Sequence, residues 1–251
     1  MVTEVNAKTH LGNPGVGISR SQYFLCSDNQ RYLVKFYQTG NRTTVNEFVV
    51  NMLAREIDLP VPDMAIVKFT EEQLGDTTEI HGNTQTREHF GVVVIKKSWN
   101  LVNRNWRRMG RVDPNSLYGV VCMDNWVRNI DRNKGQNILL RKVGAELEYW
   151  MIDAGHAFGS NRWNAESLID ESRKISPVDT HEFIRYHTHG LAGFRPWINA
   201  ISNIRIEKVR SIVNEVPSSW NLEDKDREAL ISFIMDRKDL LGEIIDRSRG
   251  F

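Results

Sequence analysis

Cysteine is scarce in this chain of 251 residues, which contains only two, Cys26 and Cys122. The two lie far apart in segments of different character, and their separation matches neither a zinc-ligand spacing nor a disulfide framework. Cys122 falls within an apolar run, which favours a small side chain in the core. The sequence therefore argues against a fold that depends on disulfides or on structural zinc.

The chain also lacks an excess of either charge, since 33 basic and 32 acidic residues leave a formal net charge of +1. This balance argues against a surface dedicated to nucleic acid or to a membrane, although local patches can hide in it. No apolar run approaches the ~18 residues of a membrane span, and the first ten residues lack the pattern of a signal peptide. We therefore expect a soluble cytoplasmic protein with no membrane span and no evident nucleic-acid binding.

What the chain does contain is a distinctive polar stretch at residues 124–158, DNWVRNIDRNKGQNILLRKVGAELEYWMIDAGHAF. Two short apolar runs within it, 138–140 and 150–152, predict the strands of a hairpin, with residues 141–148 as the turn region. The two ends of a hairpin lie side by side, so polar residues at those ends are expected to meet.

Three oxygen-bearing side chains, Asp131, Asn137 and Asp153, lie at or near the ends of this hairpin. Carboxylate and amide oxygens are ligands that suit Mg²⁺. Phosphoryl transfer from ATP needs such metal ligands on the phosphates and an aspartate near the acceptor hydroxyl. The same residue types are common in ordinary turns and at strand ends, so both interpretations stand on this stretch alone.

A second set of charged residues, Lys35 and Glu47, comes earlier in the chain. Lys35 lies in a largely apolar strand predicted at residues 31–37, where a lysine is costly unless a carboxylate faces it. Glu47 follows on a predicted helix that opens at Thr43 or Thr44. The pair fits the kinase arrangement in which the lysine holds the α- and β-phosphates. The alternatives are an exposed strand lysine and a glutamate that completes a capping box with Thr43 or Thr44.

Two further segments fit a nucleotide site. Gly15 and Gly17 belong to a turn-rich opening before a strand, where backbone N–H groups can lie over phosphates; a plain loop is the alternative. The apolar run at 90–95 predicts a central strand. In a two-lobed kinase this strand leads into the hinge that holds the adenine, which places Ile95 at the adenine. From about residue 165 the pattern is helical, with amphipathic segments at the positions 183–187, 197–213 and 227–245.

Taken in order, these motifs resemble the HipA-like kinase family, whose relatives include the phosphatidylinositol kinases. The resemblance covers roughly residues 10–160 and is carried by Lys35, Glu47, Leu59-Pro60-Val61-Pro62, Asn129-Ile130-Asp131-Arg132-Asn133, Asn137-Ile138-Leu139 and Ile152-Asp153-Ala154-Gly155-His156-Ala157-Phe158. It implies an α+β, two-lobed protein-kinase-like fold. The small β-rich N-lobe would span residues 1–96 and the mainly helical C-lobe residues 97–251.

The resemblance also implies roles for the polar residues. Asp131 would be the catalytic base, and Lys35 would bind the ATP phosphates with Glu47 as its partner. Asn137 and Asp153 would hold Mg²⁺. Two departures from the usual kinase pattern stand out. Asn137 follows Asp131 by six residues instead of five, and the metal motif reads Asp-Ala-Gly-His instead of Asp-Phe-Gly, so the phenylalanine switch of ordinary protein kinases does not carry over.

We therefore expect an ATP- and Mg²⁺-dependent phosphotransferase that acts on a hydroxyl, with a protein serine or threonine as the acceptor. One alternative is a catalytically inactive kinase fold used as a binding or regulatory module, which the six-residue spacing favours. Another is a lipid kinase or a small-molecule kinase of the aminoglycoside type, whose usual histidine is replaced here by Asn129. The acceptor is not named by the sequence, and nothing in it points to a toxin–antitoxin partner.

Overall fold

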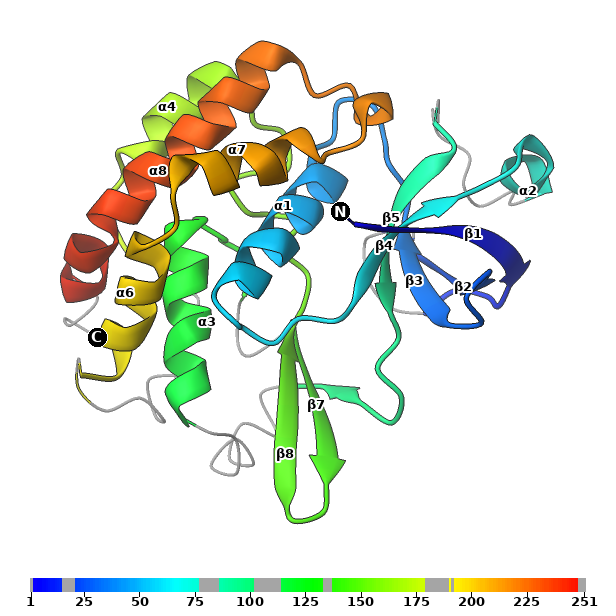
Figure 1. Cartoon of the computed structure of the whole chain (residues 1–251), viewed down its shortest axis with the longest axis horizontal. Coiled ribbons are helices and arrows are strands. Elements are labelled where there is room, and N and C mark those ends of the chain that lie inside the picture. The colour runs from blue at the N-terminus through cyan, green and yellow to red at the C-terminus, as the bar shows by residue number, and fades with distance from the viewer. Residues whose placement is uncertain are drawn as a thin grey trace.

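The computed structural model of the chain describes residues 2–14, 21–76, 86–101, 114–132, 137–178, 190 and 192–247. Within them, short strands dominate the N-terminal part and helices the C-terminal part, as Figure 1 shows. The predicted α+β class, with a β-rich first part and a helical second part, is confirmed. No helix in the described part of the chain has the length and apolar character that a membrane crossing requires.

The N-terminal strands close into a barrel. Its members, in the order β1-β2-β3-β5-β4, are β1 (Thr3–His10), β2 (Gln22–Cys26), β3 (Arg31–Lys35), β4 (Met64–Lys68) and β5 (Glu88–Val93). Neighbouring strands are antiparallel, except that β1 and β4 run parallel. Buried and half-buried residues alternate regularly in β2, because a pleated strand places every second residue on the same face. The side chains that fill this barrel core are Val5, Ala7, Phe24, Cys26, Tyr32, Val34, Ala65, Val67 and Phe69.

The helices form the second part of the molecule, on the left of Figure 1. They are α1 (Thr43–Glu56), α2 (Glu71–Asp76), α3 (Pro114–Trp126), α4 (Ala165–Ser172), α6 (Arg195–Ser202), α7 (Ile206–Asn214) and α8 (Asp224–Arg247), with the 3₁₀ turns η4 (Ala192–Phe194) and η5 (Ser218–Trp220). Helix α2 is the exception, because it lies on the barrel side. Helix α1 lies between the barrel and the C-terminal helices, so one element contacts both parts of the fold.

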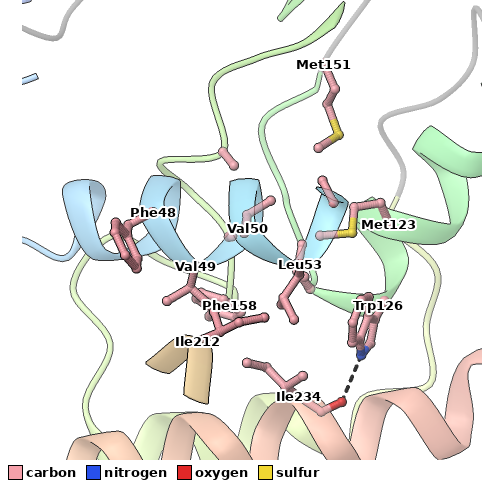
Figure 2. Close-up of a cluster of buried hydrophobic side chains, with 14 of the residues drawn as sticks. Phe48, Val49, Val50, Leu53, Met123, Trp126, Met151, Phe158, Ile212 and Ile234 are labelled. Atoms are coloured by element: carbon pink, nitrogen blue, oxygen red, sulfur yellow. Dashed lines mark hydrogen bonds between the residues drawn. The ribbon is translucent and has the colours of Figure 1, made fainter. Parts of the chain in front are cut away.

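Helix α1 is held chiefly by apolar packing. Its residues Phe48, Val49 and Leu53 are fully buried. They belong to a large cluster that includes side chains of α3, α7 and α8, and Figure 2 shows Trp126 of α3 within it. The Trp126 indole donates a hydrogen bond of 2.8 Å to the backbone oxygen of Ile234, which satisfies the one polar atom of its buried ring.

A second sheet has three strands in the order β6-β7-β8, and its β7–β8 hairpin projects at the bottom of Figure 1. Its strands are β6 (Trp99–Asn100), β7 (Ile138–Val143) and β8 (Glu146–Met151). The predicted hairpin is present, but the turn region predicted at 141–148 is wrong. Val143 pairs with Glu146, so only Gly144 and Ala145 form the loop. Gly144 adopts a φ of +61°, which glycine tolerates. With this tight loop, β7 runs three residues further than predicted and β8 begins four residues earlier.

Other predictions at the level of elements also need correction. Strand β1 was not predicted, and the helix predicted at 197–213 is divided into α6 and α7, because Arg205 has an extended backbone with ψ of 153°. The capping box considered for the start of α1 is absent as well. Arg42 is the N-cap and makes no side-chain cap bond, and Asn41 Oδ1 instead accepts from the backbone N–H of Thr43 at 2.8 Å.

Candidate active site

The first group of predicted residues meets where the barrel, helix α1 and the end of the hairpin come together. Lys35 is the last residue of β3, Glu47 lies in the second turn of α1, and Asp153 follows β8. The ammonium group of Lys35 donates to Glu47 Oε1 and, at 2.7 Å, to Asp153 Oδ1. Both alternatives for this pair, an exposed strand lysine and a capping-box glutamate, are therefore wrong.

Exposure differs sharply within this lysine–carboxylate cluster. The side chains of Lys35 and Glu47 are 9% and 2% exposed, whereas that of Asp153 is 42% exposed. The cluster is therefore closed on the α1 side and open to solvent at Asp153. A ligand that approaches from solvent meets the Asp153 carboxylate first and the Lys35 ammonium directly behind it.

Burial and charge shift the titration of all three groups. Burial opposes the charged form of Lys35, but the carboxylates of Glu47 and Asp153 outweigh it and hold the pKa of Lys35 above its usual value. Burial raises the pKa of Glu47 to about 7, because desolvation and the negative charge of Asp153 outweigh the attraction of Lys35. The Lys35 ammonium holds the pKa of Asp153 well below its usual range. Strongly shifted pKa values of this kind cluster at functional sites.

The second group of predicted residues, Asp131 and Asn137, also meets. Asn137 Nδ2 donates to the backbone oxygen of Asp131 at 2.8 Å, so the two residues are in contact although they are six positions apart in the sequence. The backbone oxygen of Asn137 accepts from the N–H of Ile152 at 3.0 Å, which brings Asn137 beside the segment that leads into Asp153. The hairpin therefore places its two ends side by side, as predicted.

Arg132 holds this arrangement in place, although no role was predicted for it from the sequence. Its side chain is fully buried and forms a two-pronged ion pair with the fully buried carboxylate of Asp124 in α3. The same guanidinium donates to the backbone oxygens of Asn137 and Ile152, at 2.5 and 3.1 Å. A guanidinium has five donors in a rigid fork, so Arg132 connects helix α3 to both ends of the hairpin. Asn129 Nδ2 adds a bond of 2.9 Å to Asp124.

The backbone at the two hairpin ends is in an uncommon conformation. Asn137 and Asp153 have φ values of +67° and +58°. Positive φ is infrequent outside glycine, although asparagine and aspartate adopt it more readily than other residues, and such positions concentrate at functional sites. Gly155 meets a different constraint, since a Cβ there would lie 2.8 Å from Cγ2 of Thr43. The glycine allows the chain after Asp153 to lie directly against the start of α1.

The donor set at the hairpin ends suits a hard divalent cation. Asp153 offers a half-exposed carboxylate, and Asn137 offers an amide oxygen, since its Nδ2 already donates to Asp131. Among the described residues, no group of three or more His, Cys, Asp or Glu side chains could form an all-protein metal cage. Mg²⁺ does not need such a cage, because it keeps several waters and binds through one or two protein ligands and substrate phosphates.

The remaining predicted site residues are less well defined. Gly15 and Gly17 lie outside the described residues. Ile95 lies in the bend after β5, half-buried, and its backbone oxygen accepts from the Ser98 hydroxyl at 2.8 Å. A role for Ile95 beside adenine therefore stays a prediction. Asp124 and Arg132 had one signal in the sequence, because Asp124 interrupts an apolar helix and needed a buried partner.

A family model described as HipA-like kinase matches residues 15–244, and no curated protein matches the chain in sequence. The fold is similar to that of the proinflammatory kinase CtkA of Helicobacter pylori, with a TM-score of 0.64 and 12% identity over 99% of both chains. It is also similar to the structure of hydra Fam20 with sugar, with a TM-score of 0.52 and 10% identity over 98% of this chain and 86% of that one. At these identities the two structures show likeness of fold alone.

Proposed function

Because the chain belongs to the HipA-like kinases, we propose that it transfers the γ-phosphoryl group of ATP to a serine or threonine hydroxyl of a protein, with Mg²⁺ as the metal. The observation that carries the proposal is the position of Lys35 between the buried Glu47 and the exposed Asp153. A cation held by one carboxylate on its closed side and facing solvent on the other is arranged to receive phosphate oxygens.

Each residue of the cluster has a distinct part in this proposal. Glu47 holds and orients the Lys35 ammonium, and Lys35 binds the α- and β-phosphates. Asp153 and Asn137 would hold Mg²⁺, which would supply positive charge to offset the charge that develops on the transferred group. Since phosphoryl transfer depends mainly on positioning and electrostatics, the fixed spacing of these groups matters more than their individual reactivity.

Asp131 is the proposed base that orients or deprotonates the acceptor hydroxyl. Its backbone N–H donates to Asn129 Oδ1 at 3.4 Å and its backbone oxygen accepts from Asn137, so the loop is held on both sides of the carboxylate. This contact also bears on the inactive-module alternative, because it keeps the aspartate and the asparagine together in spite of their longer spacing. The choice of a protein over a small molecule as the acceptor rests on the family.

We also propose that the boundary between the N-lobe (1–96) and the C-lobe (97–251) lies in the bend between β5 and β6. Two features support it. Among the described strands, β5 pairs with β3 and β4 of the barrel, whereas β6 pairs with β7. Lys97 has a φ of +59°, which turns the chain between these two sheets.

The first test is a thermal melt of wild type and Asp153→Asn with ATP, with and without Mg²⁺. A ligand that binds only the native state stabilises it by about 2.7 kcal/mol at a hundred times its dissociation constant. We expect a shift that requires Mg²⁺ in wild type and is absent in Asp153→Asn. Asp239→Asn is the matched control, because it removes the same charge from an aspartate of α8 that is 77% exposed, and it should behave like wild type.

Transfer to an acceptor needs a separate measurement. ATP labelled at the γ-phosphate is supplied with mixed protein, lipid and small-molecule fractions, and the labelled products are identified. Label on serine or threonine of proteins is the expected result, and Asp131→Asn should abolish it while leaving Mg²⁺-dependent ATP binding intact. Label confined to lipids or small molecules contradicts the protein acceptor, and normal turnover in Asp153→Asn contradicts the assignment of the metal ligand.

A further inference from the structure

Asn46, the residue before Glu47 on helix α1, makes an unusual set of contacts for a buried side chain. It is fully buried. Its Nδ2 donates to the backbone oxygens of Gly155, Ala157 and Ser160, at 2.8, 3.0 and 3.1 Å. Its Oδ1 accepts from the Trp163 indole N–H at 2.7 Å. One amide therefore contacts four residues of the segment that follows Asp153.

The chemistry of these contacts requires an amide. Three carbonyl oxygens need donors and the indole N–H needs an acceptor, and an asparagine side chain supplies both kinds of group without charge. An apolar replacement removes this side-chain donor from all three carbonyls, although the oxygen of Ala157 also accepts from the backbone N–H of Ser160 at 3.4 Å. A carboxylate in the same place would face three oxygens, and burial would penalise its charge. The contacts thus depend on the identity of the residue and not only on its size.

Other contacts hold the same two segments together near the start of α1. The backbone N–H of Arg42 donates to the backbone oxygen of Asn161 at 2.7 Å. The Arg42 guanidinium lies 5.0 Å from the centre of the Trp163 ring and pairs with Asp226 of α8. Asn46 is the central member of this set, because its bonds span the chain from Gly155 to Trp163.

These bonds join the two segments that carry the carboxylates bonded to Lys35. Glu47 follows Asn46 directly, and Asp153 lies two residues before the first carbonyl that Asn46 binds. We propose that Asn46 is a positioning residue that ties helix α1 to the segment after Asp153, so that Glu47 and Asp153 keep one fixed spacing and Asp153 is held ready to bind the metal. The inference rests on the proposed function, because it takes Asp153 as a ligand of Mg²⁺.

Two substitutions on the same helix separate positioning from general stability. Asn46→Ala removes the contacts to the segment. Asn51→Ala also removes a buried asparagine, but Asn51 Nδ2 donates only to the backbone oxygen of Glu47 within the helix, at 2.8 Å. Partners that orient metal ligands typically change metal affinity by about 10- to 100-fold when they are removed. We expect the Mg²⁺ concentration for half of the ATP-dependent thermal shift to rise at least tenfold in Asn46→Ala and less than about twofold in Asn51→Ala.

Amide hydrogen exchange provides a readout that needs no ligand. In Asn46→Ala, backbone amides of residues 154–163 should exchange faster than in wild type, whereas in Asn51→Ala they should exchange at the wild-type rate. The affinity for ATP without metal should be equal in all three proteins, because Lys35 and Glu47 are unchanged. A purely structural role predicts instead that both variants lose stability without a selective change in the requirement for metal.

The outcomes distinguish this inference from the proposed function. If wild type shows no Mg²⁺-dependent binding of ATP, the proposed function fails and the positioning role fails with it. If wild type binds and Asn46→Ala requires no more metal than Asn51→Ala, only the positioning role is overturned. Should Asn46→Ala not fold, Trp163→Phe takes its place, since it removes the indole N–H that anchors Asn46 Oδ1 and keeps an aromatic ring, although a smaller one, at this position. It should raise the metal requirement about two- to threefold, and an unchanged requirement overturns the inference.

Discussion

Replacement of Glu47 by glutamine should remove a pH dependence from the free energy of unfolding. The Glu47 side chain is 2% exposed, and burial raises its pKa from the ordinary value of 4.5 to about 7. Between these two pH values the folded protein retains the Glu47 proton, while the unfolded chain releases it. Unfolding therefore releases a proton in this range, so stability falls as the pH rises from 4.5 and levels off above about 7.

The size of this fall follows from the two pKa values. Each unit of difference corresponds to about 1.4 kcal/mol, so Glu47 lowers the stability of wild type by about 3 kcal/mol between pH 4.5 and 7. A second buried group acts in the opposite direction, because burial lowers the pKa of His89 from 6.5 to about 3. Stability then rises with pH between these values, but His89 titrates in the same way in wild type and in Glu47→Gln. The difference between the two proteins therefore reports Glu47 alone.

Lys35→Met extends the same argument. Without the ammonium, Glu47 loses the attraction that opposes burial and keeps its proton to a higher pH. The fall in stability should continue above pH 7 at about 1.4 kcal/mol per unit, whereas wild type is level there. In the double variant Lys35→Met/Glu47→Gln the extra fall should vanish, because no buried carboxyl remains on the α1 side of the site.

Denaturant unfolding at pH 5, 6, 7, 8 and 9 measures all four proteins, provided that each transition is two-state. The reasoning is refuted if the stability difference between wild type and Glu47→Gln is the same at every pH. It is also refuted if Lys35→Met loses no more stability than wild type between pH 7 and 9. In wild type and Glu47→Gln, Asp153 does not interfere, because the Lys35 ammonium holds its pKa below its usual range. Lys35→Met and the double variant both lack that ammonium, so the contribution of Glu47 is taken there from the difference between these two proteins.

Two further predictions concern the ligands of the site and its backbone. Lys35 contacts Asp153 at 2.7 Å, so phosphates that bind Lys35 should free the Asp153 carboxylate for a metal ion. Mg²⁺ and ATP should therefore raise each other's affinity by the same factor. Calorimetry should find this coupling lost in Lys35→Met, and independent binding of Mg²⁺ and ATP to wild type would refute the prediction. Gly155→Ala should destabilise the fold by about 1–3 kcal/mol through overpacking, because its Cβ would lie 2.8 Å from Thr43 Cγ2. The addition of Thr43→Ser, which removes that methyl group, should restore most of the loss in denaturant unfolding, and no recovery would contradict the steric cause.

The parts of the site that the sequence predicted are those that leave a local signal. Lys35 interrupts an apolar strand, and a buried lysine needs a carboxylate. Asn137 and Asp153 flank two short apolar runs, and hairpin geometry alone brings such flanks together. These inferences need only the period of a strand and the reversal of the chain in a hairpin. Neither depends on the exact residue at which a strand begins or ends.

The parts that the sequence did not predict depend on partners far away in the chain. Asn46 bonds to residues 109 to 117 positions later. In the sequence, however, Asn46 looks no different from any other asparagine in a helix. Strand β1 was missed because few of its residues are buried, so its alternation of apolar and polar residues is weak. The two-residue loop of the hairpin was missed because charged residues in β7 and β8 face solvent and resemble a turn. In each case the deciding contact exists only after the fold has formed.

The packing of α1 explains why folding alone assembles the cluster of Lys35, Glu47 and Asp153. The barrel has its own core, but Met64, Ile66 and Phe90 of β4 and β5 belong to the larger cluster that contains α1. The barrel that carries Lys35 is therefore held against α1 by apolar burial as well as by the ion pair. Since the helix is in turn joined to the segment after Asp153, all three charged groups are placed by contacts outside the site.

A second attachment lies away from the cluster. Trp220 of η5 donates its indole N–H to the backbone oxygen of Glu88 in β5 at 2.7 Å and stacks on Tyr37 with ring centres 6.1 Å apart. A movement of the barrel away from the helices must break this contact together with the Lys35 bonds and the apolar packing on α1. Preorganised charges stabilise a transition state without further reorganisation, and a barrel attached at separate points supplies that preorganisation. If Lys35 binds phosphates as proposed, we therefore expect the Lys35–Glu47 pair to stay formed and not to open and close as a switch.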